Sequence, residues 1–264
     1  MPITPVQLAE FLLLGWFAGG IGALTGIGGG LVVTPVLTLF FGLPMHKAIG
    51  TSLCCVIATS SGAAASYVKH HLSDIRLGMT LELATTTGAV AGALLAGAMS
   101  REALAILFAG ILVYAVTVML RRGLALRARE PEEIGPYTVK HWPFGLVGSG
   151  CAGIVSGLLG VGGGPIKVPL MYLVMGVPFK VATATSNFMM GVTAAASAFI
   201  YYSRGDVKSL VTAPCAVGIF FGAALGTRLM RRARSRWLIA IFSAIMFYFA
   251  LLMVWRATHG GFRG

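Results

Sequence analysis

The chain is dominated by apolar blocks that are long enough to cross a lipid bilayer. Hydrophobic residues make up 57% of the 264 residues and charged residues only 11%, against about 25% charged residues in a soluble domain. About 20 consecutive apolar residues span the hydrocarbon core, and the charges fall largely between blocks of that size. The sequence predicts an all-α, polytopic membrane protein, which we expect to cross the inner cell membrane several times.

The net charge of +12 does not indicate a nucleic-acid partner, because the basic residues cluster in short segments beside apolar spans. Cytoplasmic loops carry such an excess of Lys and Arg. The N-terminus shows no signal-peptide pattern, and its first basic residue is Lys47. We therefore interpret the positive charge as a signal of membrane topology, and we expect the chain to be surrounded by lipid. The two clusters are Arg121, Arg122, Arg127 and Arg129, and Arg228, Arg231, Arg232, Arg234 and Arg236.

The chain repeats itself at a constant offset of 134 residues. Over the 35 positions Gly19–Leu53 there are 13 identities with the second copy, and the offset persists where Gly88–Gly92 meets Gly222–Gly226. Self-similarity of this kind indicates a duplicated structural unit. We predict a first transmembrane repeat at 1–121, a cytoplasmic linker at 122–141 and a second transmembrane repeat at 142–264.

Each half has the same series of segments: a helix, a short apolar stretch and three spanning helices. If both Arg-rich loops are cytoplasmic, each half crosses the bilayer an odd number of times, so the halves are inverted. Loop 69–76 then lies inside, while Ser100–Glu102 and 204–208 lie outside. Inverted repeats are a recurrent plan of secondary transporters. The predicted segments are 7–27, 31–42, 46–67, 78–99 and 103–120, and then 143–161, 165–176, 180–202, 209–230 and 236–256.

Each half is interrupted by three consecutive glycines, which predict a break in a helix because glycine is unfavourable in a helix interior. About 12 residues follow each break, too few to span a bilayer, and Pro165 suits the first turn of a helix. We predict two helix hairpins whose half-helices begin inside the membrane and present free N–H groups to an anion. The alternative is that the glycines serve only close helix packing. The candidate anion-binding glycines are Gly28, Gly29 and Gly30, and Gly162, Gly163 and Gly164.

Polar residues recur after the breaks. Thr51 and Ser52 match Thr185 and Ser186, and Asn187 follows in the second half only. These side chains are predicted to complete a shell of donors around the anion, or alternatively to hydrogen-bond one helix to another. Glu82, within an apolar span, is a candidate for proton coupling; alternatively it extends toward loop 69–76.

Lys167 is the predicted cation of the site. It stands three residues after Gly164, and its repeat partner is the apolar Val33. A lysine at membrane depth costs about 2.5–3.5 kcal/mol on insertion scales, so an unpaired one usually faces a cavity and has a function. We expect Lys167 to hold the anion; the alternative is that it caps a carbonyl or pairs with Glu82.

The four cysteines lie in apolar segments without a CxxC motif or a paired histidine, so no metal site and no cofactor are expected. They are interpreted as small buried thiols, with chemistry on a sulfur compound as the alternative. The four are Cys54, Cys55, Cys151 and Cys215.

The paired G-x-G-G-G-x-x-x-x-P motifs, each followed by A-x-x-T-S, resemble the TauE/SafE family of sulfite exporters and related anion permeases. The similarity extends from about Leu8 to Arg256. It implies a transporter, often outward, of sulfite, an organosulfonate or another small sulfur-containing anion, and not an enzyme. Two rivals stay open: a membrane-embedded thiol or sulfur-transfer enzyme, and a passive anion channel. The sequence has no zinc pattern, no Gly-x-Ser-x-Gly motif and no paired intramembrane carboxylates.

Overall fold

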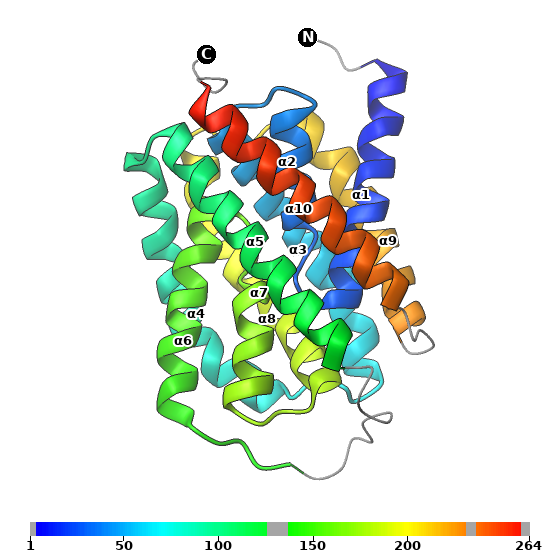
Figure 1. Cartoon of the computed structure of the whole chain (residues 1–264), viewed down its shortest axis with the longest axis vertical. Coiled ribbons are helices and arrows are strands. Elements are labelled where there is room, and N and C mark those ends of the chain that lie inside the picture. Colours follow the sequence, from blue (N-terminus) through cyan, green and yellow to red (C-terminus); the bar gives the residue numbers. More distant parts are fainter. Residues whose placement is uncertain (1–3, 126–136, 231–235, 260–264) are drawn as a thin grey trace.

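The computed structural model describes residues 4–125, 137–230 and 236–259, and within these every regular element is helical. Each predicted segment corresponds to an observed element (Figure 1). The elements are α1 (Pro5–Thr25), α2 (Gly30–Leu39), α3 (Met45–Lys69), α4 (Ile75–Ala98), α5 (Arg101–Ala125), α6 (Trp142–Leu159), α7 (Gly164–Pro169), a π-helical turn η1 (Leu170–Val174), α8 (Phe179–Ser203), α9 (Ser209–Met230) and α10 (Arg236–Thr258).

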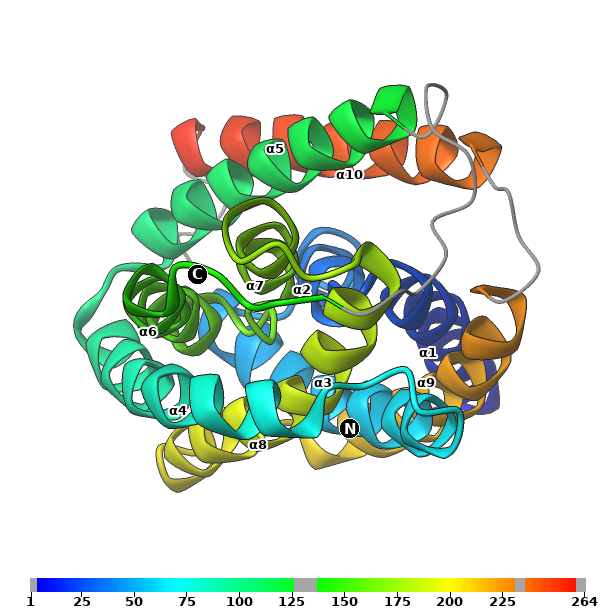
Figure 2. The ribbon, with the colours of Figure 1, turned by 90° about the horizontal axis from the view of Figure 1, so that it is seen from below.

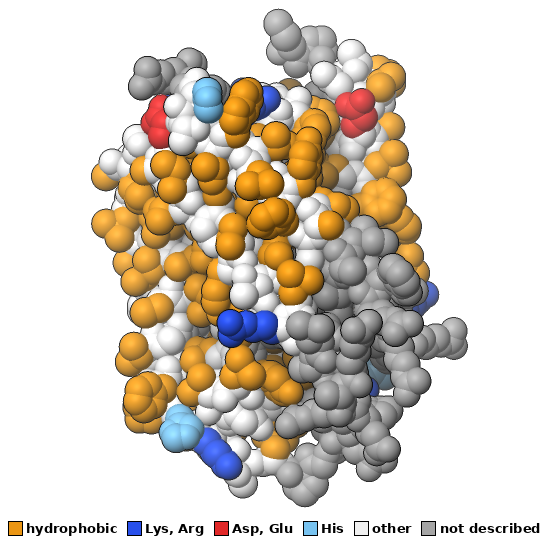
Figure 3. Space-filling view, in the orientation of Figure 1, with side chains coloured by type: hydrophobic (Ala, Val, Ile, Leu, Met, Phe, Trp, Pro, Cys, Tyr) orange, Lys and Arg blue, Asp and Glu red, His pale blue; other side chains and the backbone are white. Residues whose placement is uncertain are grey.

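The outer surface is built for lipid. Six helices in the described part of the chain are long and apolar enough to cross a membrane: α1, α3, α4, α5, α6 and α9. Large apolar side chains such as Leu83, Val147 and Phe199 are at least 70% exposed, and hydrophobic side chains predominate on the face in Figure 3. Such exposure would be unfavourable in water. The prediction of an all-α, multi-pass membrane protein is confirmed.

The two short half-helices lie in the middle of the molecule. Seen along its long axis, α2 and α7 are surrounded by the pair α5 and α10, the pairs α4 with α6 and α1 with α9, and the helices α3 and α8 (Figure 2). Among the polar residues buried there are Thr34, Ser52 and Lys167. The centre of the molecule therefore contains buried polar side chains beside the two half-helices.

The two halves pack against each other reciprocally. A Cβ on Gly19 of α1 would collide with the backbone of Ile219 in α9, and one on Gly153 of α6 would collide with the backbone of Thr85 in α4. These contacts are related by the same offset of 134 residues that relates the sequences. Small residues allow this close approach. The repeat therefore governs the interface between the halves as well as each half.

Equivalent helices run in opposite directions in Figure 1, where α1 descends from the upper end and α6 ascends from the lower end. The start of α4 and the start of α6 lie at the lower end. The side of the membrane that each end faces stays a prediction, and so does the inverted topology of the two repeats. The predicted division at 122–141 falls largely outside the described residues.

Candidate functional site

Both glycine triplets break a helix as predicted. The helix α1 ends at Thr25, Gly26 adopts a φ of 71°, and α2 starts at Gly30. The second break is equivalent: Gly160 has a φ of 70° after α6, and α7 starts at Gly164 with a proline in its first turn. Positive φ angles favour glycine. The sequence prediction of two half-helices that begin between spanning helices is confirmed.

The breaks contact each other directly. A Cβ on Gly30 would collide with the Gly160 carbonyl oxygen, and one on Gly164 would collide with that of Gly26. The Ser52 hydroxyl donates to the Gly160 carbonyl at 2.9 Å, and the equivalent Ser186 hydroxyl donates to the Gly26 carbonyl at 3.1 Å. Each half-helix therefore starts against the carbonyl that ends the opposite spanning helix. The two serines hold these carbonyls in place.

The remaining predicted donors also make hydrogen bonds between elements. Thr51 Oγ1 accepts from the Lys208 backbone N–H at 3.4 Å, and its equivalent, Thr185 Oγ1, accepts from the Asp74 N–H at 2.9 Å. The Asn187 side-chain amide donates to the carbonyls of Ala23 and Thr183 at 3.3 and 3.0 Å. In this conformation the alternative, interhelical hydrogen bonding, describes all five residues. Their role around an anion stays a prediction.

Lys167 is buried, with 1% of its surface exposed, but it is paired. Its Nζ lies 3.5 Å from Glu82 Oε2 and donates to Thr193 Oγ1 at 2.9 Å. The expectation of an unpaired lysine is therefore wrong, and the pairing with Glu82 that was given as the alternative is observed. The role of Lys167 in holding an anion stays a prediction. The reason is geometric: α4 and α7 pack on the same helices, α6 and α8, although the two residues are 85 positions apart.

Glu82 does not extend to the loop, because it is 7% exposed and its carboxylate is fully engaged. Thr193 and Thr86 both donate to Oε1, the latter at 3.1 Å, while Oε2 faces Lys167. A buried carboxylate requires such partners, since desolvation costs several kcal/mol per ion. We name Lys167, Glu82, Thr193 and Thr86 the ion-pair cluster.

The repeat-related position carries no such charge. The partners of Lys167, Glu82 and Thr193 at the offset of 134 are Val33, Ala216 and Thr59. Val33 lies in an apolar cluster with Cys55 and Cys215. The scaffold is therefore nearly symmetric, while the charge is confined to one of two equivalent places.

The glycines around the cluster differ in their backbone requirements. Gly28, Gly162 and Gly163 have φ angles of 86°, 80° and 76°, where a side chain is strained. Gly29 has an ordinary helical φ of −67°, so only its contacts limit a side chain there. A Cβ on Gly163 would lie 3.0 Å from Lys167 Cε. The lysine stem therefore runs along the second break.

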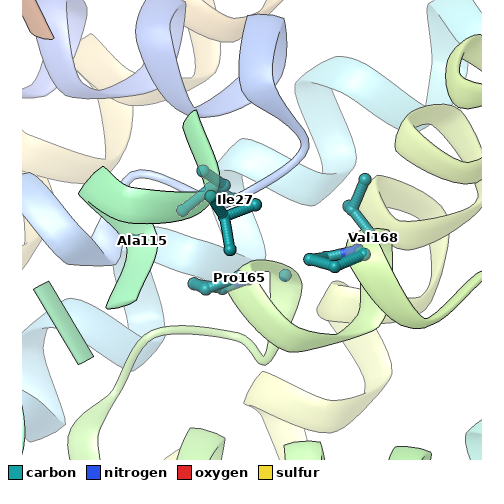
Figure 4. A pocket seen from close by; sticks show the side chains of 7 residues that line it. Ile27, Ala115, Pro165 and Val168 are labelled. Carbon is teal, nitrogen blue, oxygen red and sulfur yellow. The ribbon is translucent and has the colours of Figure 1, made fainter. Parts of the chain in front are cut away.

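The centre is closed in this conformation. A crevice between α5 and the start of α7 is lined by Ile27, Ala115, Val118, Gly164, Pro165, Val168 and Pro169 (Figure 4). It has no room for a water molecule. Lys167 is not in this lining but is itself 1% exposed, so an anion that reaches it requires the half-helices or the helices around them to separate.

Polar side-chain contacts are also found at the two ends of the molecule. The Tyr137 hydroxyl donates to Asp74 Oδ2 at 2.7 Å, and burial together with this carboxylate raises the pKa of Tyr137. At the other end Arg204 lies 3.3 Å from Asp206, donates to the Ala93 carbonyl at 2.8 Å and stacks over Tyr201. Each end is thus held by a different set of side chains.

The cysteines follow the prediction in part. Cys55 and Cys215 are buried and Cys54 is half-buried, but Cys151 is exposed on the outer face of α6. The prediction of a buried thiol is therefore wrong for Cys151. Apolar helices in a membrane have a lipid-facing side as well as a buried side, and α6 presents Cys151 on the former.

Comparison with known proteins identifies the family. The family model for the sulfite exporter TauE/SafE matches residues 11–253. The chain belongs to this family. It is 27% identical to a probable membrane transporter protein, YunE, of Bacillus subtilis over 89% of this chain and 93% of that one. YdhB, another probable membrane transporter of that organism, is 28% identical over 82% and 86%. No solved structure matches the chain.

A shorter match links the chain to a plant protein. The sulfite exporter TauE/SafE family protein 3 of Arabidopsis thaliana is 45% identical over 64 residues, which is 24% of this chain and 12% of that protein. Together these similarities place the chain among membrane transporters.

Sequence reasoning missed several residues of the central region. Thr193 and Thr86 carry no motif, and only the fold brings them to Glu82. Tyr67 and Tyr201 did have a signal, since they are identical at the offset of 134. Tyr67 donates to the Ala23 carbonyl at 2.9 Å and Tyr201 to the equivalent Gly157 carbonyl at 3.0 Å. The repeat thus marked positions that brace the last turn before each break.

Proposed function

We propose that the protein moves a small sulfur-containing anion, such as sulfite or an organosulfonate, across the cell membrane. The anion would bind near the midplane, between the starts of α2 and α7, with Lys167 as its cation. The observation that carries this proposal is the buried lysine beside the second glycine break. A cation held at membrane depth is a functional-site signal by default.

The arrangement around Lys167 suits a small oxyanion. At the start of α2 the N–H groups of Gly30 and Leu31 precede the first intrahelical donor, Val32. In α7, Pro165 has no N–H and Ile166 donates to the Gly163 carbonyl, which leaves the N–H of Gly164. The helix dipole favours negative charge at both starts. Ser52 and Ser186 stand at these starts. When the breaks move apart, the two hydroxyls lose their carbonyl partners and become donors for a ligand. Thr51, Thr185 and Asn187 lie on the same two helices, α3 and α8.

The transport cycle follows from the closed centre. Because Lys167 is 1% exposed, the anion would enter only when one side opens, as in alternating access between repeated halves. A passive channel would need a continuous path. Saturable counterflow of labelled sulfite in proteoliposomes separates the two: the carrier model expects it, and an open channel does not produce it.

Substrate class is tested by uptake and binding with sulfite, sulfate, thiosulfate and a sulfonate. We expect sulfite or the sulfonate, but not chloride, to stabilise the purified protein, by about 2.7 kcal/mol at 100 times the dissociation constant. Equal stabilisation by potassium salts of every anion would contradict a specific site. Lys167→Arg should keep part of the binding, since it keeps the charge.

A sulfur-transfer enzyme would depend on its thiols. Replacing both Cys54 and Cys55, either by serine or by alanine, should leave anion transport intact, because the proposed site uses oxygen and nitrogen donors. Loss of all sulfite-dependent activity in that variant, with the protein still monodisperse, would favour the enzyme.

Topology is tested by single cysteines in a Cys-free version. Labels in 69–76, 121–141 and 228–236 should react from the cytoplasmic side only, because Lys and Arg mark that side. Labels near Ser100 and Arg204 should react from the opposite side. Reaction of 121–141 and 228–236 from different sides would refute the inverted topology.

A further inference from the structure

We propose that the Lys167–Glu82 ion pair couples anion binding to proton uptake: Lys167 exchanges Glu82 for the substrate anion, and Glu82 takes a proton from the water on the open side. The inference rests on the proposed function, since it assumes that the anion binds at Lys167. It adds the coupling ion and the group that carries it.

The first step is charge balance at the buried pair. Lys167 and Glu82 have 1% and 9% of their side-chain surfaces exposed, and their charged atoms lie 3.5 Å apart. Together they are neutral. An anion that arrives beside this neutral pair gains little electrostatic stabilisation. It also adds one net negative charge at a depth where charge is costly. Protonation of Glu82 removes that excess charge and frees Lys167 for the anion.

The second step is the geometry of exchange. The 3.5 Å separation of Lys167 Nζ and Glu82 Oε2 is long for a charge-assisted hydrogen bond. Thr193 lies between them, accepting from Lys167 at 2.9 Å and donating to Glu82. Thr193 and Thr86 both bind Oε1, so Glu82 keeps hydrogen-bond partners after Lys167 leaves. A protonated carboxyl can then donate to a neighbouring hydroxyl.

The third step is that no other described titratable group competes for the role. The cluster lies on α4, α7 and α8, and the elements packed against these helices include α3, α5, α6 and η1. Among their other described titratable side chains, the buried Tyr67 and Tyr201 donate to the carbonyls of Ala23 and Gly157, and the buried Cys55 lies in the apolar cluster with Val33. Among the side chains that the structure describes the full set is His46, Lys47, Cys54, Cys55, Tyr67 and Lys69 on α3; Arg76 on α4; Arg101, Glu102, Tyr114 and Arg121 on α5; Cys151 on α6; Tyr172 on η1; and Lys180, Tyr201 and Tyr202 on α8, with Arg204 at its C-terminal cap.

The fourth step gives the stoichiometry. Because the repeat-related place holds Val33, Ala216 and Thr59, only one exchangeable pair exists among the residues that the structure describes. One proton should therefore enter with each anion. A symmetric pair of charged sites would have allowed two.

The test is calorimetric titration of the purified full-length protein with methanesulfonate, whose sulfonate stays ionised throughout the range used. Titration in buffers of different ionisation enthalpy gives the protons taken up per anion. We expect nearly one in the wild type at neutral pH, and an affinity that weakens about tenfold per pH unit above it. Glu82→Gln should bind without proton uptake and with no pH dependence. The matched control Glu10→Gln, an exposed position on α1, should keep the wild-type proton uptake.

Each outcome has a distinct meaning. Sulfonate and sulfite binding by the wild type without proton uptake would overturn this inference and leave the proposed function standing. No binding of either anion by a folded wild type at any pH would overturn the proposed function and the inference with it. Proton uptake that persists in Glu82→Gln would assign the proton to another group and refute the role of Glu82.

Discussion

Replacing Lys167 by methionine should destabilise the protein, and a second replacement, Glu82→Gln, should restore much of the loss. Methionine has a similar length and no charge, so the first change leaves the Glu82 carboxylate buried without its cation. Removing one partner of a buried ion pair costs about 3–5 kcal/mol, whereas replacing both is often neutral or stabilising. The two hydroxyls that still donate to Oε1 place the expected cost near the lower end, about 3 kcal/mol.

The measurement is a double-mutant cycle on the free energy of unfolding in mixed micelles with a denaturing detergent. The pairwise coupling is the difference between the double variant and the sum of the two single variants. We expect about 2–4 kcal/mol for Lys167 with Glu82. The control pair is Arg204 with Asp206, which is 3.3 Å apart but 26% and 20% exposed, and exposed pairs usually couple by about 1 kcal/mol or less.

The two cycles decide whether the cluster is a buried ion pair in the native state. Coupling at Lys167 and Glu82 no larger than at Arg204 and Asp206 would refute the reasoning, because it would mean that water screens the cluster. The double variant is also the proper negative control for transport. It keeps the fold but lacks the cation, whereas Lys167→Met alone confounds lost binding with lost stability.

Four further predictions concern the breaks. Ser52→Ala and Ser186→Ala should each lower the free energy of unfolding by about 1–3 kcal/mol, because each leaves a buried carbonyl with one partner fewer; unequal losses in unfolding titrations would contradict their equivalence. Gly163→Ala should be more destabilising than Gly29→Ala by about 1–2 kcal/mol, since only Gly163 has a positive φ, and the same titrations compare the two. Gly29→Val and Gly163→Val should both abolish sulfite binding in folded protein; retained binding would return the glycines to a packing role. Tyr201→Phe should cost about 1 kcal/mol through the lost bond to the Gly157 carbonyl, and no change on unfolding would show that water replaces the hydroxyl.

The sequence predicted the course of the chain well because its signals are local. Apolar blocks bounded by charged loops mark spanning helices, and three glycines in a row end a helix irrespective of what surrounds them. The predicted segment 209–230 coincides with α9, and α1 and α6 are capped at Gly26 and Gly160, two residues before the glycine triplets that were predicted to break the helices. The repeat gave a second, independent indication of each helix boundary.

The partner of Lys167 could not be read with the same certainty, because it depends on which helices become neighbours. Glu82 is 85 residues away and belongs to the other half. Both interpretations of that residue fitted its position in the sequence, and only the packing of α4 on α6 and α8 separates them. The same holds for Thr193, which is one of many threonines until α8 places it between the two charges.

The structure also explains why a serine occurs at the same position of both repeats, Ser52 and Ser186. Each serine holds the end of the opposite spanning helix, so a movement that opens one break removes the hydrogen bond that Ser52 or Ser186 makes across the centre. Because the two bonds are related by the repeat, opening toward either side breaks bonds of the same kind. We expect this symmetric scaffold to allow two open states of similar energy, whereas the Lys167–Glu82 ion pair, which is neutral as a whole, occupies only one of the two equivalent places. We therefore expect alternation between the two open states to depend on the residues that the halves share, and selectivity to depend on Lys167 and Glu82, which they do not share.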